Sequence, residues 1–454
     1  MAEILAVTDG PAGMRFSTIE LCRRLVAAGH AVIFAGAASA RELAEHHGLG
    51  YRELEPNGLG AFHNEDSTAG VVDRLRRIPE RRRTAAASTG ASRFAALLDE
   101  LGPDLVLLDG EMHEHIVVGA GAGVQLALLN TFCSIWRRPG LPPPHTPIRP
   151  GVGWRGNRLG MALAWTAFDL RKRIRSLRHR IGRVGCDRVS VLRSIARDAG
   201  FDLDREADPS QWLIPFTYPR LPALSLHAFE FEFHHEPAPG VRFVGPMVLE
   251  ERLDPPMPEA DRRRLDAVLD RRRGSGSEGA LLYAGFGSFF TADRRWLCRL
   301  IDAVGKRPDR ELVLALGDGL DPAELGGLPE GVYAFAWVPQ LEVLSHADAA
   351  IVHGGINTID ECVLAGVPML VVCGGETDMA GNTARVLHHG LGLAADPVGD
   401  GAVHILGRLD RLLGDAAIKE NLDRMGLAYR TYAENGEVER VVDDLLGGRR
   451  GAPP

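Results

Sequence analysis

Short apolar runs alternate with amphipathic stretches along almost the whole chain. The first half contains four runs of strand length: EILAVT, AVIFAG, LVLLD and QLALLN. A second series follows after residue 260: ALLYAGFGS, ELVLALG, VYAFAW, AAIVHGG and PMLVVCG. The stretches between them, such as STIELCRRLVAAGH, have helical spacing. Because strands that alternate with helices form parallel sheets covered by helices, the sequence predicts an α/β protein with two doubly wound domains.

The chain of 454 residues is long enough for two or three domains. A proline-rich stretch, EPAPGVRFVGPMVLEERLDPPMPE, separates the two α/β series and is typical of a linker. We therefore expect four segments: an N-terminal domain at 1–240, a linker at 241–260, a C-terminal domain at 261–430, and a C-terminal helix with a tail at 431–454.

Residues 155–185 are strongly basic and carry interleaved apolar side chains. We interpret them as a pair of solvated helices inserted in the N-terminal domain. Two other interpretations stay open: a lid over an apolar ligand, and a surface that contacts anionic lipid. A second segment, 116–136, is uncharged over the length of a membrane span, but its glycines, Gln125 and Asn130 favour a short buried helix followed by a buried strand.

The composition argues against several kinds of partner. The formal net charge of −8 provides no basic field for nucleic acid. Six cysteines are scattered without CxxC spacing, and no signal-peptide pattern opens the chain, so we expect reduced thiols in a cytoplasmic protein. The HEH at 113–115 has no further ligands at suitable spacing, and we therefore expect no metal site.

The densest group of polar and glycine residues lies at 335–385. The apolar run AAIV ends at His353, Gly354 and Gly355, and the next helix begins near Asn357 and Thr358. Glycines at such a junction let backbone N–H groups approach a ligand, and the N-terminus of a helix favours an anion. This segment contains no Walker lysine and no GxGxxG pattern. The segment therefore predicts a phosphate site formed by backbone N–H groups at a helix N-terminus, and not a P-loop or a dinucleotide-binding loop.

The same segment resembles the donor-binding signature of the UDP-glycosyltransferase superfamily, whose members have the GT-B fold. The pattern Trp-x-Pro-Gln, Leu-Ser-His, His-x-Gly-x-Asn-Ser/Thr, Glu, Gly-Val-Pro and Asp is matched in order and spacing. FGS at 286–288 and VGP at 244–246 match two further landmarks. The resemblance extends over essentially the whole chain and is strongest in the C-terminal half. It implies two Rossmann-like domains that face each other across a cleft.

The resemblance also implies roles for individual residues. Trp337 stacks on the nucleotide base, and the backbone of Val338 hydrogen-bonds the edge of the base. The remaining roles are these: Gln340 and Glu361 face the ribose, Asp378 reaches sugar hydroxyls, and the diphosphate is surrounded by Ser288, His353, Gly355, Asn357 and Thr358. A carboxylate that accepts two hydroxyl protons suits a ribose diol, which favours UDP over a deoxyribose carrier. No cofactor is implied besides this nucleotide-sugar co-substrate.

Structural roles stay open for some of these residues. Thr358 and Glu361 form a capping-box pattern, so Glu361 has a purely structural alternative. Trp337 has the alternative of a core aromatic, and Asp378 that of a turn residue.

The loop after the first strand, DGPAGMRF, departs from the superfamily pattern. There the loop lies on the acceptor side of the cleft and carries a histidine that takes the proton of the acceptor. Met14 occupies that position and cannot accept a proton. Asp109 matches the aspartate that normally orients this histidine and becomes the candidate base, with Glu111, His113 and Asp9 as weaker candidates. Alternatively, the acceptor is acidic enough to need little help, or the protein binds the donor without turnover.

A second departure is Met379, where the superfamily commonly has glutamine or histidine as a partner for the sugar. The missing hydrogen bond suggests a donor other than plain glucose. A further expectation concerns the first helix, where Ser17 and Glu20 form a capping-box pattern that predicts a start near Thr18, and Gly29 suits its end.

The function expected from the sequence is inverting transfer of a sugar from a UDP-linked, or other nucleoside-diphosphate-linked, donor to a small, largely apolar natural product. The N-terminal domain would hold this acceptor, and Met14 would line its site. Two alternatives remain: a glycolipid glycosyltransferase at a membrane surface, and a non-catalytic donor-binding auxiliary protein. A nucleotide-sugar epimerase of the same fold is less favoured, because no acidic and basic pair suited to C2 of the sugar is evident.

Overall fold

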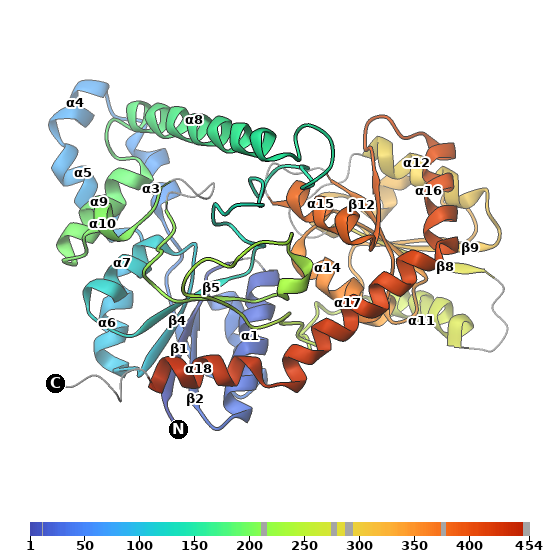
Figure 1. The fold of residues 1–454 in the computed structure, drawn as a ribbon, viewed down its shortest axis with the longest axis horizontal. Coiled ribbons are helices and arrows are strands. Elements are labelled where there is room, and N and C mark those ends of the chain that lie inside the picture. Colours follow the sequence, from blue (N-terminus) through green and yellow to red (C-terminus); the bar gives the residue numbers. More distant parts are fainter. Residues whose placement is uncertain (11, 210–215, 274–278, 287–293, 374–377, 448–454) are drawn as a thin grey trace.

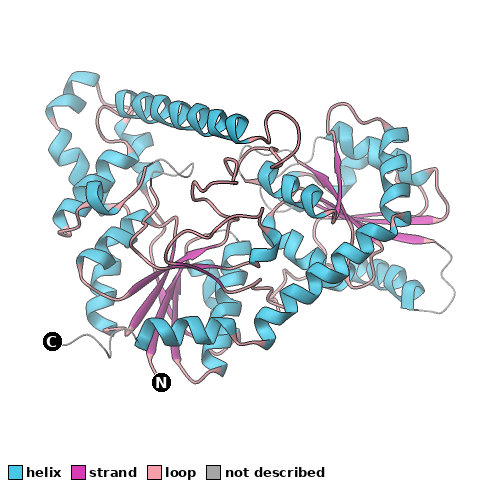
Figure 2. Ribbon diagram, in the orientation of Figure 1, coloured by secondary structure: helices cyan, strands magenta, loops and turns pink. Residues whose placement is uncertain are grey.

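The computed structural model describes residues 1–10, 12–209, 216–273, 279–286, 294–373 and 378–447. These residues form two lobes, and in each lobe helices cover both faces of a parallel sheet (Figure 1, Figure 2). The predicted class, α/β with two doubly wound domains, is confirmed. The six cysteines are free thiols. No described helix is both long and apolar enough to cross a membrane.

The N-terminal sheet has seven parallel strands in the order β3-β2-β1-β4-β5-β6-β7. Its strands are β1 Glu3–Val7, β2 Ala31–Gly36, β3 Gly50–Glu53, β4 Leu105–Asp109, β5 Leu126–Asn130, β6 Ala223–Ser225 and β7 Val241–Phe243. The helices of this part of the chain are α1 Ala12–Ala27, η1 Ala38–Ala40, α2 Arg41–His46, α3 Leu59–Asp66, α4 Val71–Arg76, α5 Ile78–Ala87, α6 Ala91–Leu101, α7 His113–Gly121, α8 Arg158–Gly182, α9 Arg188–Asp198, α10 Leu203–Glu206 and η2 Phe229–Phe231.

Strand β1 is apolar at every position after Glu3, and its packing explains why. Ile4 and Ala6 point into one hydrophobic core, and Leu5 and Val7 point into another on the opposite face. Helix α1 packs on the first face, and α6, α7 and α9 pack on the second. A parallel strand buried on both faces needs apolar residues at every position, whereas a half-exposed strand would alternate.

The C-terminal sheet has six parallel strands in the order β10-β9-β8-β11-β12-β13. Its strands are β8 Ala280–Gly285, β9 Arg310–Ala315, β10 Val332–Phe335, β11 Ala349–Val352, β12 Met369–Val372 and β13 Gly392–Ala395. The helices are α11 Glu259–Arg273, α12 Arg294–Gly305, η3 Gly317–Gly319, η4 Pro322–Leu325, α13 Gln340–Leu344, α14 Ile356–Ala365, α15 Met379–His389, α16 Ala402–Gly414, α17 Ala416–Glu434 and α18 Glu437–Gly447.

The chain returns to the N-terminal lobe at its end. Helix α17 leaves the C-terminal lobe, and α18 packs beside α1 (Figure 1). Val438, Val441 and Val442 of α18 belong to the same hydrophobic core as Ile4 and Leu21. The C-terminal helix is therefore part of the N-terminal lobe, although the sequence places it after the other domain.

Two predicted boundaries need correction. The first three residues of the predicted linker form β7, which pairs with β6, so the connection between the lobes begins after Phe243. Within residues 155–185 the chain forms one long helix, α8 Arg158–Gly182, and not a pair of helices. Asn157 caps this helix by accepting the Gly160 N–H at 2.8 Å, and no proline or glycine interrupts the next five turns.

The start of the first helix also differs from the prediction. Helix α1 includes Ala12, so Ser17 and Thr18 lie within it and not at its cap. The Thr18 hydroxyl donates to the Met14 carbonyl one turn earlier, at 2.9 Å. Gly29, with φ of +90°, follows the helix as expected. The interpretation of 116–136 is confirmed, since α7 and β5 lie there.

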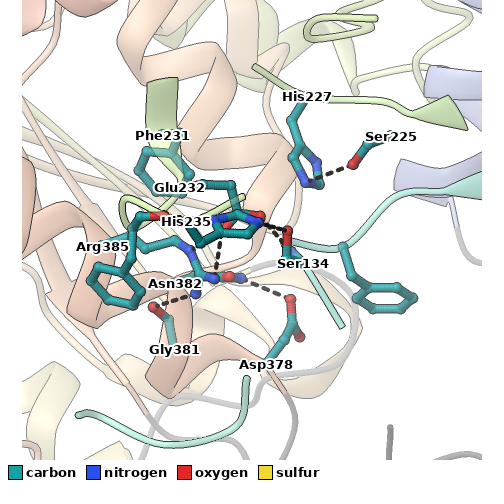
Figure 3. A network of polar contacts seen from close by, with 12 residues as sticks. Ser134, Ser225, His227, Phe231, Glu232, His235, Asp378, Gly381, Asn382 and Arg385 are labelled. Atoms are coloured by element: carbon teal, nitrogen blue, oxygen red, sulfur yellow. Dashed lines mark hydrogen bonds and ion pairs between the residues drawn. The ribbon is translucent and has the colours of Figure 1, made fainter. Parts of the chain in front are cut away.

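A buried ion pair joins the two lobes (Figure 3). Nε and Nη2 of Arg385 on α15 donate to Glu232 Oε2 at 2.9 and 2.6 Å, and both side chains are shielded from solvent. Glu232 also accepts the backbone N–H of Ser134, which follows β5. Burial works against the ionised form of Glu232, but Arg385 and His227 hold its pKa below the ordinary value. Helix α15 is thereby fixed to two segments of the N-terminal lobe.

We expect the Arg385→Met substitution to lower the free energy of unfolding by about 3–5 kcal/mol, because it leaves a carboxylate buried without a partner. Denaturant unfolding would measure this loss. The matched control is Arg263→Met, which breaks an exposed pair with Glu259 and should cost no more than about 0.5 kcal/mol. The double variant Glu232→Leu/Arg385→Met should recover most of the loss. A cost below about 1 kcal/mol for Arg385→Met would contradict this account.

Candidate functional site

The junction between β11 and α14 has the geometry of an anion site. Strand β11 ends at Val352, and α14 begins at Ile356 with Gly355 as its N-cap. A Cβ on Gly355 would lie 2.5 Å from Nε2 of His353, so only glycine leaves the ring in place. Burial lowers the pKa of His353 to about 4, against a hydrogen bond to the Gly285 backbone that raises it, so the imidazole is neutral at pH 7. The junction therefore offers unpaired helix N–H groups beside a neutral histidine.

The amino end of α1 meets this junction from the other lobe. The Ser17 hydroxyl donates to Oδ1 of Asn357 at 3.4 Å. A Cβ on Gly13 would lie 2.4 Å from Nδ2 of the same asparagine. Two helix N-termini thus face one another across the lobes, and their partial positive charges act on the same space. The opening loop of the chain and the predicted phosphate junction belong to one site.

Glu361 lies in a polar network one turn into α14. It accepts hydrogen bonds from Nε2 of Gln340 and from Nη2 of Arg252. The Tyr283 hydroxyl donates to Oε1 of Gln340 at 2.7 Å. Because Gly355 and not Thr358 is the N-cap of α14, the capping-box alternative for Glu361 does not apply. Gln340 and Glu361, predicted to act together, are in contact.

Trp337 faces a hollow and not a closed core. It is half-buried, and together with Pro339 it lines a cavity of about 410 Å³. The opposite wall comes from the connection between the lobes, at Arg252–Pro255 and Met257, and from Arg262 of α11. Burial raises the pKa of Asp254 in this wall to about 6, against the charge of Arg252. Val338, the next residue after the tryptophan, is buried.

Asp378 is connected through Asn382 to the glycine junction, which is the segment His353–Gly355 between β11 and α14. Nδ2 of Asn382 donates to Oδ2 of Asp378 at 2.8 Å and to the carbonyl of Gly354 at 3.0 Å. Asp378 is the N-cap residue of α15 and is nearly buried. Figure 3 shows it beside the Arg385–Glu232 pair. Ser288, predicted at the diphosphate, lies outside the described residues.

The N-terminal lobe contributes Asp109 at the end of β4. Its Oδ2 accepts the Thr8 hydroxyl at 2.9 Å, and its Oδ1 accepts the N–H of Glu111 at 2.9 Å. Burial raises the pKa of Asp109 to about 6, and the nearby carboxylate of Asp9 adds to the rise. The carboxyl therefore changes its charge close to neutral pH.

Met14 lies in the first turn of α1 and is nearly buried. A Cβ on Gly10 would lie 2.6 Å from its Sδ, so this glycine leaves room for the methionine side chain. A side chain is excluded at Gly10 and at Gly13 by different neighbours. Gly10 leaves room for Met14, and Gly13 leaves room for Asn357 of the other lobe.

An apolar cavity of about 250 Å³ begins beside Asp109. Gly110 and Glu111, the residues that follow Asp109, form part of its wall. Most of the remaining lining is aliphatic or aromatic: Leu128, Leu129, Ile135, Trp136, Phe216 and Tyr218. A cavity of this kind suits a small ligand with a large apolar surface.

The HEH segment has structural partners. Nδ1 of His113 lies 2.9 Å from the Tyr218 hydroxyl, and burial lowers the pKa of this histidine to about 3. Glu114 pairs with Arg188 at 3.0 Å, and His115 packs on Phe94. His113 is fully buried, and its low pKa keeps the ring neutral at pH 7.

The arrangement of the lobes is that of known proteins. The structure superposes on the glycosyltransferase of kitacinnamycin with a TM-score of 0.68 and 21% identity, over 98% of this chain and 99% of that one. The glycosyltransferase VinC, solved in complex with DTDP, superposes with a TM-score of 0.60 and 17% identity, over 97% and 100% of the two chains. At these identities the likeness concerns the fold, which is the predicted GT-B fold.

The C-terminal lobe is also similar in sequence to known proteins. Residues 298–442 match the family model described as Erythromycin biosynthesis protein CIII-like, C-terminal domain. Oleandomycin glycosyltransferase of Streptomyces antibioticus is 36% identical over 174 residues, which cover 38% of this chain and 39% of that protein. The match thus spans about two fifths of the length of this curated relative. The resemblance to glycosyltransferases is confirmed, in sequence for the C-terminal lobe and in fold for the whole chain.

The raised pKa of Asp109 predicts a pH-dependent stability. The native state binds this proton more tightly than the unfolded chain, whose aspartates titrate near 3.8. The free energy of unfolding should therefore fall as pH rises from about 4 to about 6, and then level off. The difference between the two pKa values corresponds to about 3 kcal/mol. In Asp109→Asn this dependence should be absent, so the variant should gain stability relative to the wild type between pH 4 and pH 7.

Urea unfolding of both proteins at pH 4 and at pH 7 measures this gain in the free energy of unfolding. The matched control is Asp302→Asn, an exposed aspartate on α12, whose stability should follow that of the wild type at both pH values. An equal pH dependence in wild type and Asp109→Asn would contradict the account.

Proposed function

We propose that this protein is an inverting glycosyltransferase that moves a sugar from a nucleoside diphosphate to a small, largely apolar natural product, as in antibiotic biosynthesis. The observation that carries the proposal is the meeting of α1 and α14 at the glycine junction, with Trp337 and the Gln340–Glu361 pair beside it. The names of the similar proteins, which include oleandomycin and kitacinnamycin glycosyltransferases, support this acceptor class.

In this proposal the C-terminal lobe binds the donor. The N–H groups at the start of α14 and the ring of His353 hold the diphosphate without a metal ion, since the helix end itself supplies the positive potential. The base occupies the cavity beside Trp337, and the ribose hydroxyls donate to Glu361. Asp378, held by Asn382, receives hydroxyls of the sugar.

UDP is the proposed carrier, because a ribose diol offers Glu361 two donors. Thymidine diphosphate is the second candidate, supported by the complex of VinC with DTDP and by Arg252, which already donates to one oxygen of Glu361. Titration calorimetry with UDP and dTDP separates the two.

Asp109 is the proposed general base. It lies where the apolar cavity begins, and its pKa of about 6 is close to the pH at which it would have to accept a proton. Glu111 lines the same cavity and is the alternative base. The apolar cavity is the proposed acceptor site.

Met14 favours a second candidate function. Because a thioether replaces the usual base, the chain could bind the donor beside an active transferase without turnover. Nucleotide binding with no transfer to any acceptor, together with activity gained in Met14→His, would support this second function over the first.

Two donor-site substitutions test the proposal. We expect Glu361→Gln to lower the affinity for UDP by about 10- to 100-fold, because a hydrogen bond to a charged group contributes about 1.5–3 kcal/mol. The same variant should lose less affinity for dTDP, which lacks one ribose hydroxyl. His353→Ala should lower the affinity for UDP and the affinity for dTDP by the same factor. The control Asp302→Asn on α12 should bind as the wild type does, and unchanged UDP affinity in both site variants would contradict the proposed donor site.

The base is tested by transfer to a panel of phenolic and polyketide acceptors, followed by mass spectrometry. We expect the wild-type rate to rise as pH passes through about 6, because the base must be deprotonated. Asp109→Asn should lower kcat by about 10²- to 10⁴-fold, and Glu111→Gln should leave it nearly unchanged. The reverse pattern would make Glu111 the base, and full activity in both variants would mean that the acceptor needs no base.

A further inference from the structure

Exposed apolar side chains are concentrated on one part of the surface. Among the described residues, 17 large apolar side chains are exposed, and 11 of them lie in α4, in the loop before α8, and in α8. The 11 are Val71, Val72, Leu75, Val152, Trp154, Leu159, Leu163, Leu170, Ile174, Leu177 and Ile181. A concentration of this kind marks an interaction surface.

Helix α8 has two apolar faces, and only one is covered by the protein. Met161, Trp165 and Phe168 are buried against the body of the N-terminal lobe. Leu163, Leu170, Ile174, Leu177 and Ile181 recur at spacings of three, four and seven residues and form a stripe on the opposite face. The side chains of Leu163 and Ile181 are 63% and 69% exposed. The fold alone gives no reason for this second stripe.

Arginines flank the outer stripe on both sides. Arg173 and Arg180 lie on one side of it, and Arg171 and Arg178 on the other, by helical spacing. None of the four forms an ion pair with another described residue. The 25 residues of α8 contain seven Arg or Lys against one Asp, a formal charge of +6 in a chain of −8. The helix is a basic, apolar strip on an otherwise acidic molecule.

The surface continues beyond both ends of α8. Helix α4 lies near its C-terminal end along the same edge of the molecule (Figure 1), and Arg81 holds the two together by donating to the carbonyls of Arg74 and Val184. Val71, Val72 and Leu75 of α4 are exposed there, beside Arg76 and Arg77. At the other end Trp154 is 66% exposed, with the guanidinium of Arg155 over its ring.

We infer that this surface, formed by α4, the loop at 152–155 and α8, binds an anionic lipid bilayer. Apolar side chains in a helix that lies flat enter the boundary between headgroups and acyl chains, and the flanking arginines reach the lipid phosphates. Trp154 suits the same depth. This inference does not depend on the reaction proposed above.

The charges argue against a second copy of the chain as the occupant. Two copies packed through the stripe would place the four arginines of one helix against those of the other. A single acidic helix of a partner protein would cover the stripe of α8 but would leave α4 and Trp154 exposed. A bilayer extends over all three segments and supplies negative charge along their whole length.

The test uses cosedimentation of the full chain with vesicles of phosphatidylcholine containing about 30% phosphatidylglycerol, and with pure phosphatidylcholine vesicles. We expect binding to the anionic vesicles alone, with at least a tenfold loss when NaCl is raised from about 0.1 to 0.5 M. The fluorescence of the wild type should shift to the blue on binding, and Trp154→Phe should reduce that shift.

Two sets of substitutions separate the apolar and charged contributions. Leu170→Ser/Ile174→Ser/Leu177→Ser should lower the partition coefficient at least tenfold. Arg171→Gln/Arg173→Gln/Arg178→Gln/Arg180→Gln should lower it by at least about 100-fold, since each basic residue near an anionic surface contributes roughly fivefold. The matched control is Val398→Ser/Val403→Ser, which removes two exposed valines from the C-terminal lobe and should bind as the wild type does.

All variants change exposed side chains, so the melting temperature and nucleotide binding should stay at wild-type values, which distinguishes lost lipid binding from lost folding. Absence of binding to anionic vesicles, equal binding to both kinds of vesicle, or wild-type binding by the triple-serine variant would each overturn the inference. Dimers in sedimentation velocity that the triple-serine variant abolishes, without any vesicle binding, would overturn it in favour of contact between copies.

Discussion

The buried pair between Arg385 and Glu232 is the contact on which the geometry of the site depends. Each lobe has its own sheet, and Cys133, Ala228 and Phe231 of the N-terminal lobe pack into the core of the C-terminal lobe. The ion pair fixes α15 against the segments after β5 and around η2. Asp378 is the N-cap residue of α15, and Asn382 lies in its first turn. Asn382 donates hydrogen bonds to Asp378 and to the carbonyl of Gly354 in the glycine junction. The ion pair therefore positions the candidate sugar site relative to the N-terminal lobe, together with the Ser17–Asn357 contact and the packing of α18 on α1.

Close approach of backbone is the second constraint. Gly13, Gly10 and Gly355 each stand where a Cβ would collide with a neighbouring side chain. At Gly13 that neighbour belongs to the other lobe, so the glycine allows two helix ends to share one space. The combined effect of the two helix ends is a region of positive potential that needs no basic side chain. This arrangement would allow the proposed phosphate site to work without a Walker lysine.

Local patterns predicted the parts of the fold that depend on neighbours in sequence. The apolar runs located nine of the strands and the glycine junction, and the resemblance to glycosyltransferases implied that Gln340 and Glu361 act together. Contacts between distant segments could not be predicted in this way. Arg252 lies 109 residues from Glu361, and Glu232 lies 153 residues from Arg385, and neither has a sequence pattern that names its partner. The capping-box pattern at Ser17 was also wrong, because α1 already includes Ala12.

The environment of Asp109 shows what replacing the usual histidine with Met14 changes. A carboxylate beside a histidine would be held ionised, since a neighbouring imidazolium favours the negative charge. In this protein the surroundings of Asp109 are instead a hydroxyl, an amide and the carboxylate of Asp9, and burial dominates its pKa. The methionine fills the space next to Gly10 with an apolar group, which cannot hold a neighbouring carboxylate ionised as an imidazolium would. Without an imidazolium beside it, Asp109 titrates nearer to neutral pH, which is the property that the proposed role as general base requires.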